Sequence, residues 1–317
     1  MSGTTSFNIH KIKIEPGDPH KVVGEPSAVR YQVNPCTDTI ASEEPLEVWL
    51  KLQLPGHTRP TKLITTMRSP GDDLNLVRGW LHTSGLVEDK ADIQSLTHTG
   101  TGRLQHGQSN QVLVTMGPNI TLDTRGQQRV EYAHSGCGVC GQQSIETLLT
   151  KLPESTAGGG LPLPLAWVYP LAQTLKSQQP VFAQTGGNHG AGLFELTALL
   201  ADNLTLTDVR EDVGRHNALD KLIGAHLPDL LETAGHQYGV VLSGRISFDL
   251  VQKAAMANIT FVLAMGAPSS LAIELARECD ICLVGFIKAG SMNIYSCPER
   301  ILCEPPDTGQ SSPSSNT

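Results

Sequence analysis

Apolar runs of strand length alternate with helical stretches in the second half of the chain. Residues 238–242, 260–265 and 281–286 are mostly apolar, and a helical pattern follows the first run over 248–258. A second helical stretch precedes the third run, and a further strand is expected at 292–295. Strand, helix, strand, helix, strand in this order is typical of a parallel sheet with crossover helices.

The first half shows a different period. Apolar and polar residues alternate from Leu46 to Gln53, which predicts a half-buried strand, and 63–67 predicts a second strand. Ser69-Pro70-Gly71-Asp72 combines a capping serine, a proline at the first helical position and an acid, so we expect a helix to begin there. With further strands expected at 93–97 and 111–115, this half predicts an α+β arrangement.

These patterns divide the chain into four parts. We expect residues 1–35 to be a flexible tail, or a tail with one edge strand, followed by an α+β domain over 36–152. A connector rich in proline and glycine at 153–164 opens an α/β domain that extends over 153–303. Proline, serine, glycine and threonine dominate 304–317, which predicts a disordered end.

Composition narrows the class of protein. The chain has 317 residues, of which 39% are apolar and 17% charged, as in soluble globular proteins. A formal net charge of −8 argues against general binding to nucleic acid or acidic lipid. The sequence has neither a signal peptide nor an apolar run near the ~20 residues of a membrane span. Its seven cysteines are scattered rather than arranged as a disulfide framework, so we expect the protein to be located in a reducing cytoplasm.

Two cysteines carry a specific chemical expectation. Cys137 and Cys140 lie in the run Gly136–Gly141, where glycines on both sides free the backbone. Ser144 can cap a following helix, and the positive end of that helix and nearby His134 would both favour the thiolate. Because the thiolate is the reactive form, this run predicts a site of thiol chemistry.

Two connectors of the second half lie where such sheets bind ligands, beyond a strand and ahead of a helix. Ser243, Gly244 and Arg245 offer a hydroxyl, an open backbone and a guanidinium. Residues 266–270 offer a glycine and two hydroxyls at the equivalent place. For each connector taken singly, the alternative is that it only makes a turn and a helix cap.

A third connector gathers positive charge in an acidic chain. Arg210, Arg215, His216 and Lys221 surround the start of a predicted helix. Cations are unfavourable near a helix N-terminus unless an anion is present, and free N–H groups there bind phosphate. We therefore expect an anion site at Arg215 and His216. A fourth connector ends at His189, which we interpret as a structural histidine.

Cys279 and Cys282 form a second Cys-x-x-Cys pair. A free cysteine usually behaves as a small buried hydrophobe, and the apolar surroundings of Cys282 favour this interpretation. The alternative joins this pair with Cys137 and Cys140 in a four-thiolate zinc site, which would require a tetrahedral arrangement of two pairs that lie far apart in the sequence.

Several runs, in this order, carry a resemblance to one family. They are Glu43-Glu44-Pro45-Leu46, Gly136–Gly141, Thr185-Gly186-Gly187 with His189, Glu211–Ala218 with Asp220-Lys221, Ser243-Gly244-Arg245, and Gly285-Phe286 leading to Met292–Tyr295. Together they span roughly residues 40–300 and resemble the FdhD family of formate dehydrogenase accessory sulfurtransferases.

The resemblance implies a sulfur carrier in the maturation of molybdenum or tungsten formate dehydrogenases. Proteins that look like this receive persulfide sulfur from a cysteine desulfurase. They pass it to bis-molybdopterin guanine dinucleotide before that cofactor enters the formate dehydrogenase apoenzyme. For this chain the resemblance implies Cys137 as the persulfide carrier, Cys140 as its partner, no permanently bound metal, and a homodimer.

The resemblance also implies a cofactor-binding segment, which consists of Phe286, Ile287, Lys288, Ala289, Gly290 and Ser291. The expected binding set is completed by the connectors described above, through Arg215, His216, Ser243, Gly244 and Arg245.

The family is similar to cytidine deaminases in its second domain, so the α/β domain is expected to be cytidine-deaminase-like. A zinc deaminase needs His-x-Glu and a later Pro-Cys-x-x-Cys. Here Ala191 stands where the glutamate would be relative to His189, and two serines follow Pro268. Because these ligands and this base are missing from the sequence, deamination is not expected.

Two other classes of protein stay open. A dithiol oxidoreductase would use Cys137 and Cys140 as a redox pair, although they lack the thioredoxin-like strand-loop-helix context. A zinc-stabilised binding protein would have no catalysis, and metal analysis of the reduced protein would reveal it. Replacing Cys140 alone separates an oxidoreductase, which must lose turnover, from a carrier that retains a persulfide on Cys137.

Overall fold

The computed structural model describes most of the chain. The described residues are 3–14, 31–54, 59–87, 90–100, 110–118, 161–197, 205–232 and 237–303. Cys137 and Cys140, the connector as far as Gly160 and the segment 304–317 lie outside them. The expectations for those segments therefore stay predictions.

A six-stranded sheet forms the centre of the second half. Its spatial order is β13 (Ser291–Ile294), β12 (Cys282–Lys288), β11 (Ile259–Ala264), β10 (Tyr238–Leu242), β8 (His189–Glu195) and β9 (Asp208–Asp212). The strands β10, β11 and β12 are parallel, which confirms the predicted parallel arrangement. The outer strands β13, β8 and β9 are antiparallel to their neighbours. The turn before β13 is too short for a crossover helix, so this strand returns beside β12.

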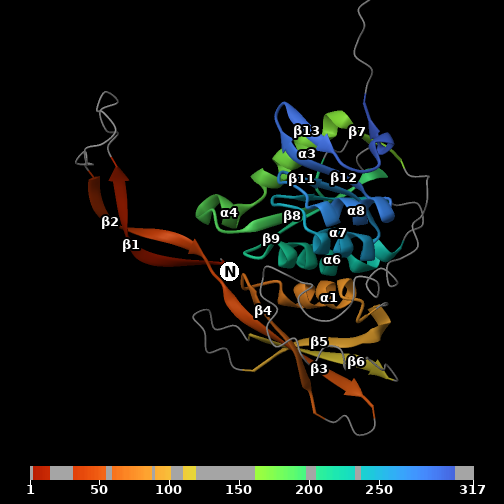
Figure 1. The fold of residues 1–317 in the computed structure, drawn as a ribbon. Coiled ribbons are helices and arrows are strands. Elements are labelled where there is room, and N and C mark those ends of the chain that lie inside the picture. Colours follow the sequence, from red (N-terminus) through yellow and green to blue (C-terminus); the bar gives the residue numbers. More distant parts are fainter. Residues whose placement is uncertain are drawn as a thin grey trace, which may run out of the picture.

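Helices cover both faces of this sheet (Figure 1). One face carries α6 (Arg215–Leu231), α7 (Phe248–Met256) and α8 (Ser270–Glu278), and the other carries α3 (Leu165–Ser177), followed by α4 (Pro180–Thr185). On β11, Val262 belongs to the first core and Phe261 to the second. Both faces are buried, which explains why these strands are continuous apolar runs. No helix in the described part of the chain is long and apolar enough to cross a membrane.

A short strand pair joins the two ends of the second half. The strand β7 (Leu163–Pro164) is parallel to β14 (Ile301–Leu302), which follows the 3-10 helix Pro298–Arg300. The guanidinium of Arg300 lies 4.4 Å from the centre of the Phe261 ring. These contacts hold the last described segment against the α3 side of the sheet.

The first half has its own sheet and core, as the sequence predicts. The spatial order is β4 (Thr61–Arg68), β3 (Glu44–Gln53), β6 (Gln111–Pro118) and β5 (Ile93–Thr99), with the 3-10 helix Lys90–Asp92 before β5. The helix α1 (Asp73–Thr83) packs on one face through Leu76, Val77 and Leu81. The strand β3 is parallel to β6 and antiparallel to β4, so this α+β sheet is mixed.

The predicted start of α1 is wrong in detail. The helix begins at Asp73, and its cap residue is Asp72 with a left-handed φ of 61°. Ser69 does not cap it, because Ser69 forms its hydrogen bonds with Asp212, Asn188, Val213 and Lys221 of the second half of the chain. The helix still ends close to Gly85, whose φ of 67° suits glycine.

The two halves meet where α1 packs against α6, as Figure 1 shows. Gly79 of α1 and Gly224 of α6 allow this approach, because a Cβ at Gly224 would lie 1.9 Å from a backbone oxygen of α1. Beside this contact, Lys253 pairs with Asp220 at 2.8 Å and also donates to the hydroxyl of Thr83. Side chains from both halves therefore share one buried polar network.

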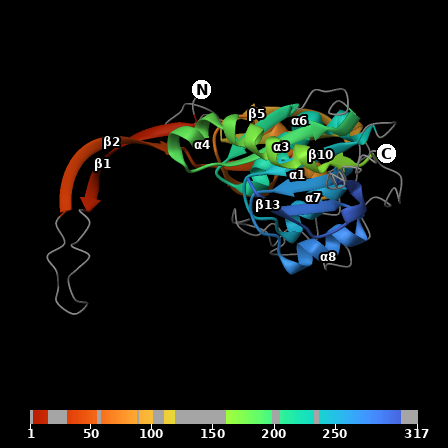
Figure 2. The same ribbon diagram turned by 90° about the horizontal axis from the view of Figure 1, so that it is seen from above.

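Of the two expectations for residues 1–35, the described part agrees with the one that includes a strand. Thr4–Ile14 forms β1, which pairs antiparallel with β2 (Tyr31–Ala41) along its whole length. This ribbon projects away from the body of the molecule (Figures 1 and 2). Its large apolar side chains Phe7, Ile12 and Val33 are exposed. The alternation that suggested one edge strand belongs to a paired strand, whose partner β2 begins within the expected tail and extends beyond it.

Candidate functional site

The predicted connectors meet at one edge of the six-stranded sheet. The carboxyl ends of β9, β10, β11 and β12 lie at this edge, together with the amino ends of the antiparallel strands β8 and β13. In the register, His189 is opposite Asp212, and Ala191 is opposite Leu242. This edge therefore brings together the connectors at 212–217, 243–245, 266–270 and 286–291.

Backbone hydrogen bonds fix these connectors against one another. Gly190 and Ser243 exchange two bonds, because the amide of Gly190 donates to the Ser243 hydroxyl at 2.8 Å and its carbonyl accepts from the Ser243 amide. The amide of Gly266 donates to the carbonyl of Gly244, and that of Phe286 donates to the carbonyl of Gly266. Ser243 therefore has a structural hydroxyl at this edge.

Close packing requires glycine at one of these positions and leaves little room for a Cβ at another. A Cβ at Gly266 would lie 2.5 Å from the carbonyl oxygen of Gly244. A Cβ at Gly244 would lie 3.0 Å from Nδ1 of His189. The space beside Gly244, which the sequence predicted to be open, is thus occupied by the ring of His189. His189 is therefore part of the site.

His189, Arg215 and Arg245 form the positive part of this edge. Burial, followed by the charges of Arg215 and Arg245, lowers the pKa of His189 below its ordinary value of 6.5, and Asp212 opposes that shift. At pH 7 the His189 ring is therefore neutral. The buried Nε of Arg215 has no hydrogen-bond partner among the described residues. A buried N–H donor without a partner is costly, which favours an anion at this position.

The other predicted cations are neutralised within the protein. Arg210 pairs with Asp208 at 2.8 Å and with Asp72 at 3.0 Å. Lys221 is buried and pairs with Asp212 at 2.8 Å. Of the four cations gathered in the sequence, neither Arg210 nor Lys221 is available to a ligand.

His216 lies behind the edge rather than on it. Its Nε2 is 3.2 Å from the Ser247 hydroxyl and 3.7 Å from a carboxylate oxygen of Asp249. In a Ser-His-Asp relay the two ring nitrogens would face the serine and the aspartate separately. Here one nitrogen faces both, so the geometry does not provide that relay, and His216 instead connects α6 to the start of α7.

Most of the Glu211–Ala218 run has a structural role. Glu211 accepts hydrogen bonds from the amides of Val181 and Phe182 at the start of α4. Asp212, which is fully buried, accepts from the amide of Gly214 at 2.8 Å and from the side chain of Asn217 at 3.2 Å. Arg215 is the member of this run that remains on the ligand side.

The segment 286–291 forms the hairpin between β12 and β13. Phe286 is exposed and has a left-handed φ of 54°, an unusual conformation for a bulky residue. Lys288, Ala289, Gly290 and Ser291 are also exposed. Ile287 is buried in the core on the α3 side, so its side chain faces away from a ligand at this surface.

The second cysteine pair has no catalytic environment. Burial raises the pKa of Cys279 to about 11 and that of Cys282 to about 12, so both remain thiols at pH 7. Cys282 lies in the core on the α3 side, as expected of a small buried hydrophobe. Within the described ranges, no three His, Cys, Asp or Glu side chains are grouped to hold a metal ion.

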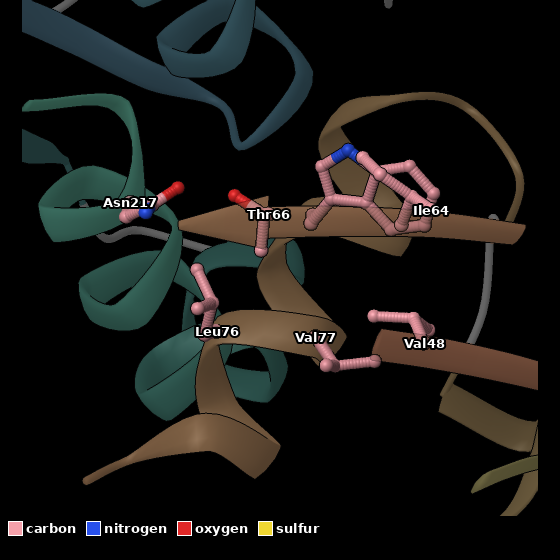
Figure 3. Close-up of a pocket in the computed structure, with 7 residues that line it drawn as sticks. Val48, Ile64, Thr66, Leu76, Val77 and Asn217 are labelled. Carbon is pink, nitrogen blue, oxygen red and sulfur yellow. The ribbon is translucent and has the colours of Figure 1, made fainter. Parts of the chain in front are cut away.

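A small pocket lies between the first sheet, α1 and the start of α6 (Figure 3). It is lined by Val48, Ile64, Thr66, Leu76, Val77, Trp80 and Asn217. The amide of Asn217 donates to the carbonyl of Met67 at 2.7 Å. The lining offers packing but no titratable group, so the sheet edge is the better candidate site.

Sequence reasoning missed Ser69, which contacts this edge from the first half. The misleading signal was Pro70, because serine followed by proline is typical of a helix start. Asn188 appeared in a predicted loop without a role, and it accepts a hydrogen bond from Ser69 at 3.3 Å. No local pattern could indicate a contact between residues so far apart in the sequence.

Comparison with known proteins places the chain in a family. The family model for FdhD/NarQ matches residues 41–302. The sulfur carrier protein FdhD of Streptomyces coelicolor is 37% identical over 270 residues, covering 83% of this chain and 89% of that protein. The protein of the same name from Mycobacterium tuberculosis is 37% identical over 290 residues, covering 89% of this chain and 98% of that protein. The fold and site thus define a two-part α/β protein with two arginines and a histidine at one sheet edge, and the chain belongs to the FdhD/NarQ family.

A solved structure shares the fold. It is a crystal structure of a candidate formate dehydrogenase accessory protein from Desulfotalea psychrophila, with a TM-score of 0.62 and 22% identity. The match covers 94% of this chain and 99% of that chain. The mixed α/β architecture described above is therefore that of an FdhD-type protein, whereas the cytidine-deaminase-like description stays a prediction.

The position of His189 beside two guanidinium groups can be tested by titration. Arg215→Gln should raise the pKa of His189 toward 6.5, because one of the charges that lowers it is removed. An NMR titration, with the ring signals assigned through His189→Gln, measures this shift. Arg59→Gln serves as the control at an exposed arginine of the first half and should leave the pKa unchanged. An unchanged or lower pKa in Arg215→Gln would contradict the described cluster.

Proposed function

We propose that this chain is a sulfur carrier that supports formate dehydrogenase. It takes sulfur as a persulfide from a cysteine desulfurase and passes it to bis-molybdopterin guanine dinucleotide, which is a substrate here and not a resident cofactor. Membership of the FdhD/NarQ family supports the general role, since relatives covering most of the chain are named sulfur carrier proteins. The partners and the cofactor are the finer part of the proposal.

The single observation that carries the proposal is the buried Nε of Arg215, which has no hydrogen-bond partner in the described structure. It lies at the N-terminus of α6, whose cap residue Gly214 provides no side-chain bond to the first turn. Helix N-termini and arginine forks are both suited to phosphate oxygens. The chain has a net charge of −8 and does not attract anions in general. Binding of an anionic ligand would therefore depend on this local arrangement.

A guanine dinucleotide cofactor fits the chemistry of this edge. Its diphosphates would bind Arg215, Arg245 and the start of α6. The exposed ring of Phe286 offers an aromatic surface for a flat heterocycle. The exposed hairpin residues Lys288 and Ser291 offer a charge and a hydroxyl beside it. His189, neutral at pH 7, adds a hydrogen-bonding group without further charge.

The two thiols of residues 136–141 are sufficient for both the loading and the release of the transferred sulfur atom. The Cys137 thiolate attacks the outer sulfur of the donor persulfide, the donor S–S bond breaks, and the desulfurase thiolate leaves. Attack of the Cys140 thiolate on the inner sulfur of the new persulfide then releases the outer sulfur as sulfide. That step forms a Cys137–Cys140 disulfide, and a dithiol reductant must restore both thiols for the next cycle.

The remaining expectations belong to the same proposal. The carrier acts in the cytoplasm as a homodimer and delivers the sulfurated cofactor to formate dehydrogenase apoenzyme, with either molybdenum or tungsten as the metal. It binds neither nucleic acid nor membranes. The net charge of −8 argues against general attraction to nucleic acid or acidic lipid.

Cysteine variants test the carrier chemistry. Cys137→Ala should abolish sulfur loading, because the attacking thiolate is lost, whereas Cys140→Ala should retain a persulfide on Cys137. Peptide mass spectrometry after incubation with a cysteine desulfurase and cysteine measures the added sulfur. Cys36→Ala, at an exposed cysteine of β2, is the matched control and should load normally. Full sulfur occupancy of Cys137→Ala would refute the assignment.

Arginine variants test the anion site. Arg215→Ala and Arg245→Ala should each weaken GDP binding by roughly tenfold or more, since each removes charge-assisted hydrogen bonds to phosphate. Isothermal titration calorimetry measures the affinity, with Arg59→Ala as the guanidinium control. Unchanged affinity in both site variants would remove the argument for phosphate binding at this edge.

A further inference from the structure

Ser69 connects the first half of the chain to two of the connectors at the site edge. Its amide donates to a carboxylate oxygen of Asp212 at 3.0 Å, and its carbonyl accepts from Lys221 at 2.9 Å. Its hydroxyl accepts from the amide of Val213 at 3.1 Å and donates to the side-chain oxygen of Asn188 at 3.3 Å. With only 3% of its surface exposed, Ser69 has its amide, carbonyl and hydroxyl all bound to the second half.

The hydroxyl of Ser69 bridges the neighbours of the two site residues. Val213 is two positions before Arg215, and Asn188 immediately precedes His189. The two connectors approach along the pairing of β8 with β9, in which His189 is opposite Asp212. The bridge therefore crosses the point where each connector leaves its strand.

The position of Ser69 is fixed by the buried hydrogen bonds of the residue that precedes it. The preceding residue, Arg68, is fully buried and makes a bidentate pair with Asp73 at 2.8 and 2.9 Å. Arg68 also donates to the carbonyl of Glu44 and to the side chain of Asn110. The start of α1 and the end of β4 are thus fixed relative to each other, and Ser69 stands between them.

We propose that Ser69 is a positioning residue of the anion site, through which the first half of the chain holds the connectors of His189 and Arg215 in binding geometry. This inference rests on the proposed function, because it concerns the same ligand site. Two guanidinium groups beside one histidine repel each other, so the empty site needs a scaffold to keep them together. A fixed hydrogen-bond bridge provides such preorganisation without contacting the ligand.

The test compares Ser69→Ala with Thr83→Val in the full chain. Thr83 makes a buried hydrogen bond to Asp220 in the same contact between the halves, away from the edge. Ser69→Ala should weaken GDP binding about fivefold to tenfold, because the variant loses a bridge whose contribution to the binding free energy is about that of one hydrogen bond. It should also change the pKa of His189, because the distances to Arg215, Arg245 and Asp212 change. Thr83→Val should change neither, although both variants should lower the thermal unfolding temperature.

The outcomes separate this inference from the proposed function. Wild-type protein that fails to bind GDP contradicts the proposed function itself. Wild-type binding, together with unchanged GDP affinity and unchanged His189 pKa in folded Ser69→Ala, overturns the positioning role alone. Equal losses in Thr83→Val and Ser69→Ala also overturn it, because they would indicate a general effect of the contact between the halves. If Ser69→Ala does not fold, Asn188→Ala removes the other end of the bridge, and normal GDP binding in that variant overturns the role.

Discussion

The buried carboxylate of Asp212 is the contact on which the arrangement of this protein depends. It is fully buried, pairs with Lys221 at 2.8 Å and accepts the amide of Ser69 from the other half of the chain. A buried ion pair adds little net stability, but removing one partner leaves an unpaired charge at a cost of about 3–5 kcal/mol. Asp212 therefore acts mainly by fixing which segments lie together, and the connector that carries Arg215 is one of them.

The distribution of charge at the site edge follows from this arrangement. Arg210 and Lys221 are neutralised by aspartates within the protein. Arg215 and Arg245 are close enough to His189 to lower its pKa, and Arg215 retains a buried donor without a partner among the described residues. The carboxylates thus build the scaffold, and Arg215 and Arg245 are the guanidinium groups that we propose for the ligand. This division explains how an acidic chain can offer a local site for a polyanion.

The sequence predicted those parts of the fold that depend on local periodicity. The strands β3, β10, β11 and β12 were found because their apolar positions repeat along the chain, and burial on both faces makes β11 a continuous apolar run. The positions of connectors at the carboxyl edge followed from the parallel topology. The edge strand allowed for residues 1–35 corresponds to β1, whereas its pairing partner β2 (Tyr31–Ala41) was missed. Pairing between distant segments leaves only a weak local signal.

The site could be predicted only in part, for a similar reason. Arg215 was identified because cations near a helix start are unusual, and Arg245 because its connector lies beyond a strand and ahead of a helix. In the sequence Lys221 looked equally available to a ligand, and only the fold shows that it forms an ion pair with Asp212. Ser69 looked like a helix cap, yet its partners lie more than a hundred positions away. Residue type and spacing indicate a chemistry, whereas the availability of each group depends on contacts that only the folded chain creates.

A crystal structure of the full chain with bound GDP tests the central claim most directly. The account predicts diphosphate oxygens within hydrogen-bond distance of Arg215 Nε and the first amides of α6, with the pairs Asp212–Lys221 and Arg68–Asp73 intact. Nucleotide bound elsewhere on the molecule, or an edge that stays empty at saturating GDP, would contradict it.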